Sequence, residues 1–132
     1  MSEELIAIAK ESDSTWTIKV KDNAGAALDM TVFANVVIVL FSEDNVVIDK
    51  YSVIESTGWK GIAEGGETNE LVIVLQSEES KAAPVGKVYF ELRAIAEDVD
   101  VTDGRYDTII PKQLLCEIVE SVSSGLTLPV IP

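Results

Sequence analysis

The stretch Trp16-Thr17-Ile18-Lys19-Val20 alternates large apolar residues with polar ones. A period of two places the three apolar side chains on one face of an extended strand and the polar side chains on the other. A strand that is apolar on one face only is typical of antiparallel sheets. The turn-forming residues Asp22-Asn23-Ala24-Gly25 come next, so we expect the strand to end there.

Similar apolar bursts recur along the chain, separated by turn residues. They predict strands at residues 5–9, 36–41, 46–54, 71–75 and 88–95, and a last strand or strand pair at 106–122. Because proline cannot donate to a ladder, Pro111 marks an edge, a bulge or a break in that last segment. Residues 77–83 predict one helical turn, with Ser77 as its N-cap and Pro84 as its stop. Seven or eight short, evenly spaced strands indicate an all-β sandwich or barrel, and we favour the two-sheet sandwich.

The length of 132 residues suits one domain with its own hydrophobic core. We place a β-sandwich domain at residues 1–124 and an extended tail, with two prolines, at 125–132. Acidic residues near the start stand where a secretion signal needs basic ones, and no apolar run reaches the length of a membrane span. The single cysteine, Cys116, cannot form an internal disulfide, so we expect folding or assembly in a cytosol without secretion.

The net charge is −13, from 23 acidic and 10 basic residues. Nucleic acids are bound by neutralising phosphates with lysine and arginine, so the charge argues against nucleic-acid binding. It argues equally against docking on anionic membrane lipid. Two interpretations stay open: the acids keep unassembled copies soluble and apart, or they serve a basic partner surface or cation sites.

Residues suited to catalysis are scarce. The chain has no histidine, which removes the commonest general base and the histidine-dependent triads and metal sites. Cys116 lies in an apolar stretch without a basic neighbour to lower its pKa, so we expect a buried, inert thiol. No glycine-rich phosphate loop is present, and no carboxylate pair has a glycosidase context. We therefore expect no enzyme activity and no cofactor.

The acidic segment at residues 97–104 is a weak candidate for a metal site. Asp98, Asp100 and Asp103 are spaced closely enough to offer several oxygen ligands to calcium. However, Asp103 stands where an EF-hand loop needs glycine, and the closing glutamate is missing. We favour a solvated hairpin loop without a metal.

Two features point to contact with other subunits. The run Val36 to Phe41 is apolar on both faces, although a two-layer sandwich buries only one face of each sheet. Its second face, made by Val37, Val39 and Phe41, needs cover from loops, from the helical turn or from another subunit. Trp16 belongs to the core face of its strand, whereas Trp59 lies in a polar, glycine-bounded loop and is either a contact residue or a cap over the sandwich. The interface candidates are Trp59, Val37, Val39, Phe41, and Leu126 and Leu128 of the tail.

The segment from Trp16 to Thr31 resembles the opening of an immunoglobulin-like domain of tailed-phage and prophage structural proteins. The N-terminal domain of phage baseplate upper proteins is the nearest such family. In it, an alternating strand ends in a Lys-Asp-x-x-Gly turn, followed by a Leu-Asp-Leu-Thr-like segment and an apolar strand. Here those places are taken by Lys21-Asp22-Asn23-Ala24-Gly25, by Leu28-Asp29-Met30-Thr31 and by residues 36–41. Later, Pro84-Val85-Gly86 leads into the aromatic strand Val88-Tyr89-Phe90-Glu91-Leu92-Arg93 in the same order, while the long segment 105–122 with Pro111 departs from the family.

The resemblance implies an immunoglobulin-like antiparallel β-sandwich of seven to eight strands. It also implies a virion structural protein of a bacteriophage or prophage, in the baseplate, tail, neck or head, that assembles in the host cytoplasm. The expected partners are other virion proteins or copies of the chain in a homo-oligomer, and the resemblance transfers no catalytic residues. The alternative is a non-catalytic ligand-binding or adhesive sandwich, dependent on carbohydrate or calcium.

Overall fold

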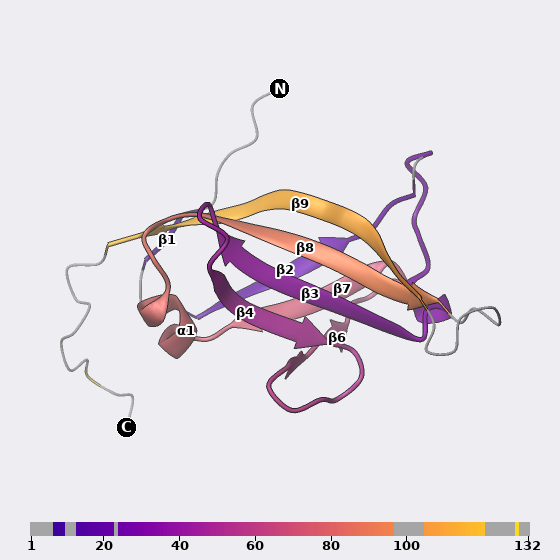
Figure 1. Cartoon of the computed structure of the whole chain (residues 1–132), viewed down its shortest axis with the longest axis horizontal. Helices are drawn as coiled ribbons and strands as arrows, with labels where there is room; N and C mark the ends of the chain where they lie inside the picture. The colour runs from indigo at the N-terminus through magenta and orange to yellow at the C-terminus, as the bar shows by residue number, and fades with distance from the viewer. Residues whose placement is uncertain (1–6, 10–12, 23, 97–104, 121–128, 130–132) are drawn as a thin grey trace.

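The computed structural model describes residues 7–9, 13–22, 24–96, 105–120 and 129, and the structural statements below concern these residues. Its elements, in chain order, are β1 (Ala7–Ala9), β2 (Ser14–Lys19), the 3-10 turn η1 (Met30–Val32), β3 (Asn35–Ser42), β4 (Val47–Ser52), β5 (Lys60–Gly61), β6 (Ala63–Glu64), β7 (Glu70–Leu75), α1 (Ser77–Ala82), β8 (Gly86–Ala96) and β9 (Arg105–Val119). Figure 1 shows two layers, with β3, β4, β8 and β9 nearer the viewer and β2 and β7 behind them. The chain is an all-β sandwich, as predicted.

The strand order is that of an immunoglobulin-like sandwich. One sheet has the order β1-β9-β8-β3-β4-β5 and the other the order β2-β7-β6. In immunoglobulin letters these correspond to a G-F-C-C′ sheet facing a B-E-D sheet, as in variable-type domains. All strand pairs are antiparallel except β1 with β9 and β4 with β5. Seven strands have three residues or more, and the two-residue strands β5 and β6 occupy a segment where we predicted only a loop.

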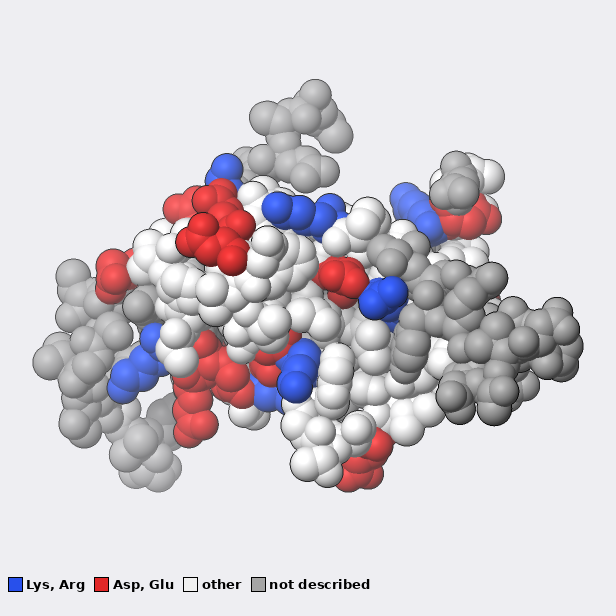
Figure 2. Space-filling view, viewed as in Figure 1, with Lys and Arg blue, Asp and Glu red and all other residues white. Residues whose placement is uncertain are grey.

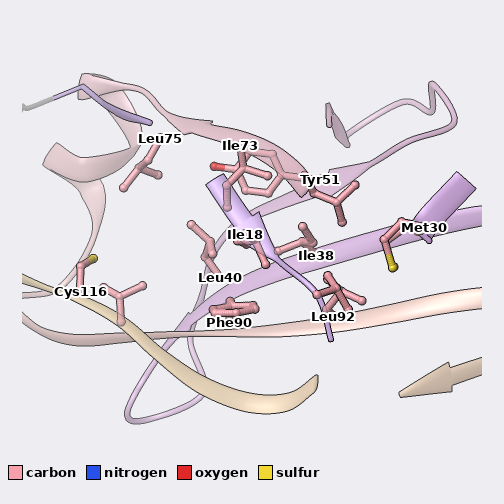
Figure 3. Packing of buried hydrophobic residues seen from close by; sticks show 14 of the residues in the cluster. Ile18, Met30, Ile38, Leu40, Tyr51, Ile73, Leu75, Phe90, Leu92 and Cys116 are labelled. Atoms are coloured by element: carbon pink, nitrogen blue, oxygen red, sulfur yellow. The ribbon is translucent and has the colours of Figure 1, made fainter. Parts of the chain in front are cut away.

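The core forms where the inward faces of the two sheets meet. Along β3, Val36, Ile38 and Leu40 are buried and point inward. From the other sheet, Ile73 and Leu75 of β7 meet them, as Figure 3 shows for several of these side chains. Trp16 packs against the same cluster and Cys116 is fully buried in it, so both core predictions are confirmed.

A β-bulge surrounds Pro111 in β9. Phe90 pairs with Gln113 and Leu92 with Ile110, so Pro111 and Lys112 together stand opposite Glu91 alone. A bulge leaves the extra residue out of the ladder, which suits a residue without an N–H. Pro111 therefore marks a bulge in one continuous strand, and it does not break the segment into two.

The helical turn α1 closes one end of the sandwich beside β4 (Figure 1). Its position matches the prediction, but its cap does not. Gln76 is the N-cap residue and makes no capping bond with its side chain, whereas Ser77 is the first helical residue. The Ser77 N–H donates instead to Asp13 Oδ1, at an N–O distance of 2.7 Å. The prediction of Ser77 as the cap was wrong because the real acceptor comes from a distant part of the chain.

No helix within the described residues is both long enough and apolar enough to span a membrane.

Candidate functional site

The outer face of the six-stranded sheet carries the predicted contact residues of β3. Since Val36, Ile38 and Leu40 point into the core, Val37, Val39 and Phe41 point away from it. Val37 and Val39 are half-buried, and Phe41 is only 9% exposed. The first two therefore offer apolar surface to a partner, while most of Phe41 is already covered within the chain.

Phe41 packs against an aromatic ring from the neighbouring strand β8. Tyr89 of β8 stacks on it with ring centroids 6.0 Å apart. Lys112, at the bulge of β9, places its ammonium 4.4 Å from the centre of the Tyr89 ring. The Tyr89 hydroxyl donates to Glu43 at 3.4 Å in the exposed hairpin. This part of the outer face thus consists of two stacked aromatic rings with the charged side chains of Lys112 and Glu43 beside them.

Trp59 lies in a shallow hollow beside the same face. The hollow has a volume of about 300 Å³, and Val37, Ser52, Ile54 and Trp59 line it. Lys50 places its ammonium 5.1 Å from the centre of the Trp59 ring, within the range of a cation–π contact. Ile54, which we had not singled out, is 54% exposed at its edge. The structure therefore brings Trp59 and Val37 together in one hollow.

Asn35 fixes the backbone of this hollow. Its side-chain amide donates to Ser52 Oγ at 3.0 Å, and its carbonyl oxygen accepts from the N–H of Ile54 at 2.9 Å. Asn35 and Ser52 are both buried, so these bonds satisfy polar groups that water does not reach. They hold the chain after β4 against the start of β3, which keeps Ile54 in place.

The charge of the outer face differs from that of the whole protein. The residues paired with Val37 and Val39 include the cations Lys50 and Arg93, and a single acid, Glu91, which lies 3.7 Å from Arg93. Figure 2, which views this face, shows separated lysine and arginine side chains on a largely uncharged surface, with one acidic group beside a basic one near the centre and larger acidic groups toward the margins. The centre of the face is thus not acidic, despite the net charge of −13.

A second hollow opens between the sheets, at the end of the core where Met30 lies (Figure 3). It has a volume of about 340 Å³ and an apolar lining of Met30, Phe33, Val36 and Leu71. Glu64, Glu67 and Glu70 also line it. The opening was not predicted, because its walls come from three separate segments, residues 30–36, 53 and 64–71, and only the acids around Gly65-Gly66 indicate it in the sequence.

A charged cluster lies between β4, β5 and α1. Lys60 forms ion pairs with Glu79 of α1 and, at 2.8 Å, with Asp49 of β4. Burial lowers the pKa of Lys60, but its hydrogen bonds to both carboxylates and their charges raise it by more, so the pKa is raised. The pKa of Tyr51 is raised well above its ordinary value, mainly by burial and secondly by the charge of Asp49. Both groups therefore keep their protons at neutral pH, which suits a structural clamp and not a general base.

The remaining candidate residues are either inert or outside the described part of the chain. Burial raises the pKa of the Cys116 thiol to about 11, so little reactive thiolate forms at neutral pH. Within the described residues, no group of three or more acidic or sulfur ligands could hold a metal ion. Asp98, Asp100, Asp103, Leu126 and Leu128 lie outside those residues, as does the domain boundary predicted at residue 124.

Comparison of the chain with models of protein families, with curated proteins and with solved structures found no match.

Proposed function

We propose that this chain is a virion structural protein of a bacteriophage or prophage, which works by assembly of copies through the outer face of its six-stranded sheet. The observation that carries the proposal is the partly exposed apolar surface of Val37, Val39, Ile54 and Trp59 on a face that no third layer of the described residues covers. The immunoglobulin-like strand order agrees with the resemblance to tailed-phage structural domains, from which the virion role and location are taken.

The apolar content of β3 is higher than a two-layer sandwich needs. A sheet in such a fold buries one face, and its other face is normally polar. On β3 every position from 36 to 41 is apolar, so Val37 and Val39 on its outer face keep part of their apolar surface in contact with water. Apolar surface of this kind, rimmed by charged side chains, is typical of the core of a protein–protein interface.

The charge pattern supports contact at this face. Two copies with a net charge of −13 each repel one another at long range. Lys50, Arg93 and Lys112 lie around the apolar centre with Glu91 as the single acid among them, so this face carries no excess of negative charge. Other virion proteins are equally suitable partners for the outer face of the six-stranded sheet. We propose no nucleic-acid or membrane partner and no enzyme activity.

Native mass spectrometry and light scattering of the purified chain test the proposal. We expect a defined oligomer that dissociates in the variant Val39→Lys, which places a charge in the centre of the face. The matched control is Val74→Lys, because Val74 is 41% exposed on the other sheet. A strict monomer at about 100 µM, where a weak but specific contact is populated, contradicts self-assembly. Equal dissociation of both variants contradicts the choice of face.

Two further measurements separate virion assembly from the ligand-binding alternative. After prophage induction in the source strain, the chain should co-sediment with purified particles at a fixed stoichiometry. The oligomer should also be indifferent to calcium and to a chelator. A monomer whose unfolding temperature rises with calcium supports the adhesive, calcium-dependent sandwich instead.

A further inference from the structure

The opening beside Met30 combines an apolar interior with an acidic mouth. Met30, Val36 and Leu71 are buried residues whose side chains form its interior, and half-buried Phe33 adds an aromatic wall. A volume of about 340 Å³ lies at the lower end of the range found for ligand sites. The interior therefore has room for an extended aliphatic group.

Two acids at the mouth, Glu64 and Glu67, have no ion-pair partner among the described residues. Glu64 pairs with Leu71 in the ladder between β6 and β7, so it shares the inward face with Leu71 and lies at the mouth. Glu67 follows in the exposed loop. Neither carboxylate forms an ion pair with any of the described residues, and no lysine or arginine lines the opening. Glu70 differs, because Lys19 is its partner in the ladder between β2 and β7.

We propose that this opening binds a lysine side chain of a partner protein, with its aliphatic stem against the apolar interior and its ammonium between Glu64 and Glu67. Lysine combines a long apolar stem with a charged tip, so it matches both parts of the site. A purely apolar group would leave the two carboxylates without a partner, and an anion would be repelled. Lysine fits better than arginine here, because its compact ammonium on a flexible stem needs no planar, bidentate arrangement of the carboxylates.

The surroundings favour a polypeptide over a free amine. Asn35 lines both this opening and the hollow that holds Trp59, so the two lie next to each other. Val53, which is 49% exposed, lines the opening between two residues, Ser52 and Ile54, that line the Trp59 hollow, and it offers apolar contact to a chain lying across both. Glu64 and Glu67 at the mouth therefore attract a basic segment.

The site does not depend on the proposed self-assembly, since it lies between the sheets and not on the outer face. Its test uses two short capped peptides, acetyl-Gly-Lys-Gly-amide and acetyl-Gly-norleucine-Gly-amide. Norleucine keeps the four-carbon stem of lysine and lacks the ammonium. Amide shifts in ¹H–¹⁵N NMR spectra of the full chain report where each peptide binds, while the oligomeric state is read separately by light scattering.

We expect the lysine peptide to shift the amides of Met30, Val36 and Leu71 at about 10 mM, in keeping with a millimolar affinity. The double variant Glu64→Gln/Glu67→Gln should weaken this binding about three- to ten-fold, since exposed charge pairs contribute modestly. Glu78→Gln, on exposed α1 at the other end, is the control with the same change of group and should bind as wild type does.

Three results would overturn the proposal. They are no shifts at these amides, equal binding of the norleucine peptide, and unchanged binding by the double variant. Because the peptide comparison needs no substitution, it stays decisive even if a variant proves unstable. Failure here would leave the assembly proposal intact, since that proposal is tested by the oligomeric state alone.

Discussion

The variant Tyr51→Phe removes one hydroxyl that joins the two sheets. Tyr51 is 1% exposed, and its hydroxyl donates to the backbone carbonyl of Val74 on β7 at 2.9 Å, with Asp49 Oδ2 at 3.0 Å. The ring keeps its packing in the variant, so the change isolates the hydroxyl. Loss of one buried hydrogen bond, with an acceptor left poorly satisfied, costs about 1–2 kcal/mol of unfolding free energy.

This loss converts into a measurable shift of the unfolding temperature. An unfolding entropy of about 2.1 cal/mol/K per residue gives about 0.28 kcal/mol/K for a chain of 132 residues. The melting temperature of Tyr51→Phe should therefore fall by about 4–7 °C, and the urea midpoint should fall at an unchanged m-value. Calorimetry and urea titration followed by circular dichroism measure both.

Tyr89→Phe is the matched control, because it removes the same atom from an exposed site. The Tyr89 hydroxyl reaches Glu43 at 3.4 Å in the exposed hairpin, so its loss should cost less than about 0.5 kcal/mol. If the two variants lose the same stability, or if Tyr51→Phe is as stable as wild type, the hydroxyl does not join the sheets and the argument fails.

The pH dependence gives an independent reading of the same group. The folded-state pKa of Tyr51 is raised above the unfolded value near 10, so folding favours the protonated phenol. Its contribution is complete below about pH 10 and is lost as the pH rises above that value. Wild type should therefore lose stability more steeply than Tyr51→Phe above pH 10. Parallel slopes for the two proteins would show that Tyr51 ionises normally in the folded state.

Three further predictions concern the core, the buried thiol and the helix cap. Leu40→Ala, in the fully buried part of β3, should lower the free energy of unfolding in urea by about 2–5 kcal/mol. Val32→Ala, at a residue that is 70% exposed, should change it by less than about 0.5 kcal/mol. Similar losses in the two variants would place Leu40 outside the core. Cys116 should react with a thiol reagent at pH 8 only after unfolding, because its pKa is about 11 and it is fully buried; rapid reaction in native buffer would contradict this. Asp13→Ala should cost about 0.5–2 kcal/mol, because it removes the acceptor of the Ser77 N–H, while an unchanged midpoint would show that water replaces the cap.

The alternation of side chains predicted most of the fold because it is a local property. Trp16, Ile18 and Val20 follow the period of a half-buried strand, and each takes the core position that this period assigns. The two-sided apolar run of β3 was predicted in the same way, and its inner half lies in the core. Periodicity says which residues share a face, so it succeeds wherever burial of one face decides the structure.

The elements that were missed depend on contacts between distant residues. β5 forms because Lys60 and Gly61 pair with Tyr51 and Ser52, and two residues are too short to show a period. The cap of α1 joins Asp13 to Ser77, and no local pattern near Ser77 reveals it. The opening between the sheets likewise needs the register of β6 with β7, which places Glu64 beside its apolar interior. Such features follow from the packing of the sheets and not from any one segment.

The unequal distribution of charge means that salt should affect the two proposed contacts in opposite directions. Copies that each carry −13 repel one another over several ångströms of water, and salt screens this long-range repulsion. Association through the outer face of the six-stranded sheet should therefore strengthen as sodium chloride rises from about 0.05 to 0.5 M. Binding of a lysine side chain at Glu64 and Glu67 is an attraction between opposite charges, so the same change should weaken it. Light scattering and peptide titration on one sample series measure both trends. Association that weakens with salt would indicate that charge pairing, and not the apolar surface around Val37 and Trp59, holds the copies together.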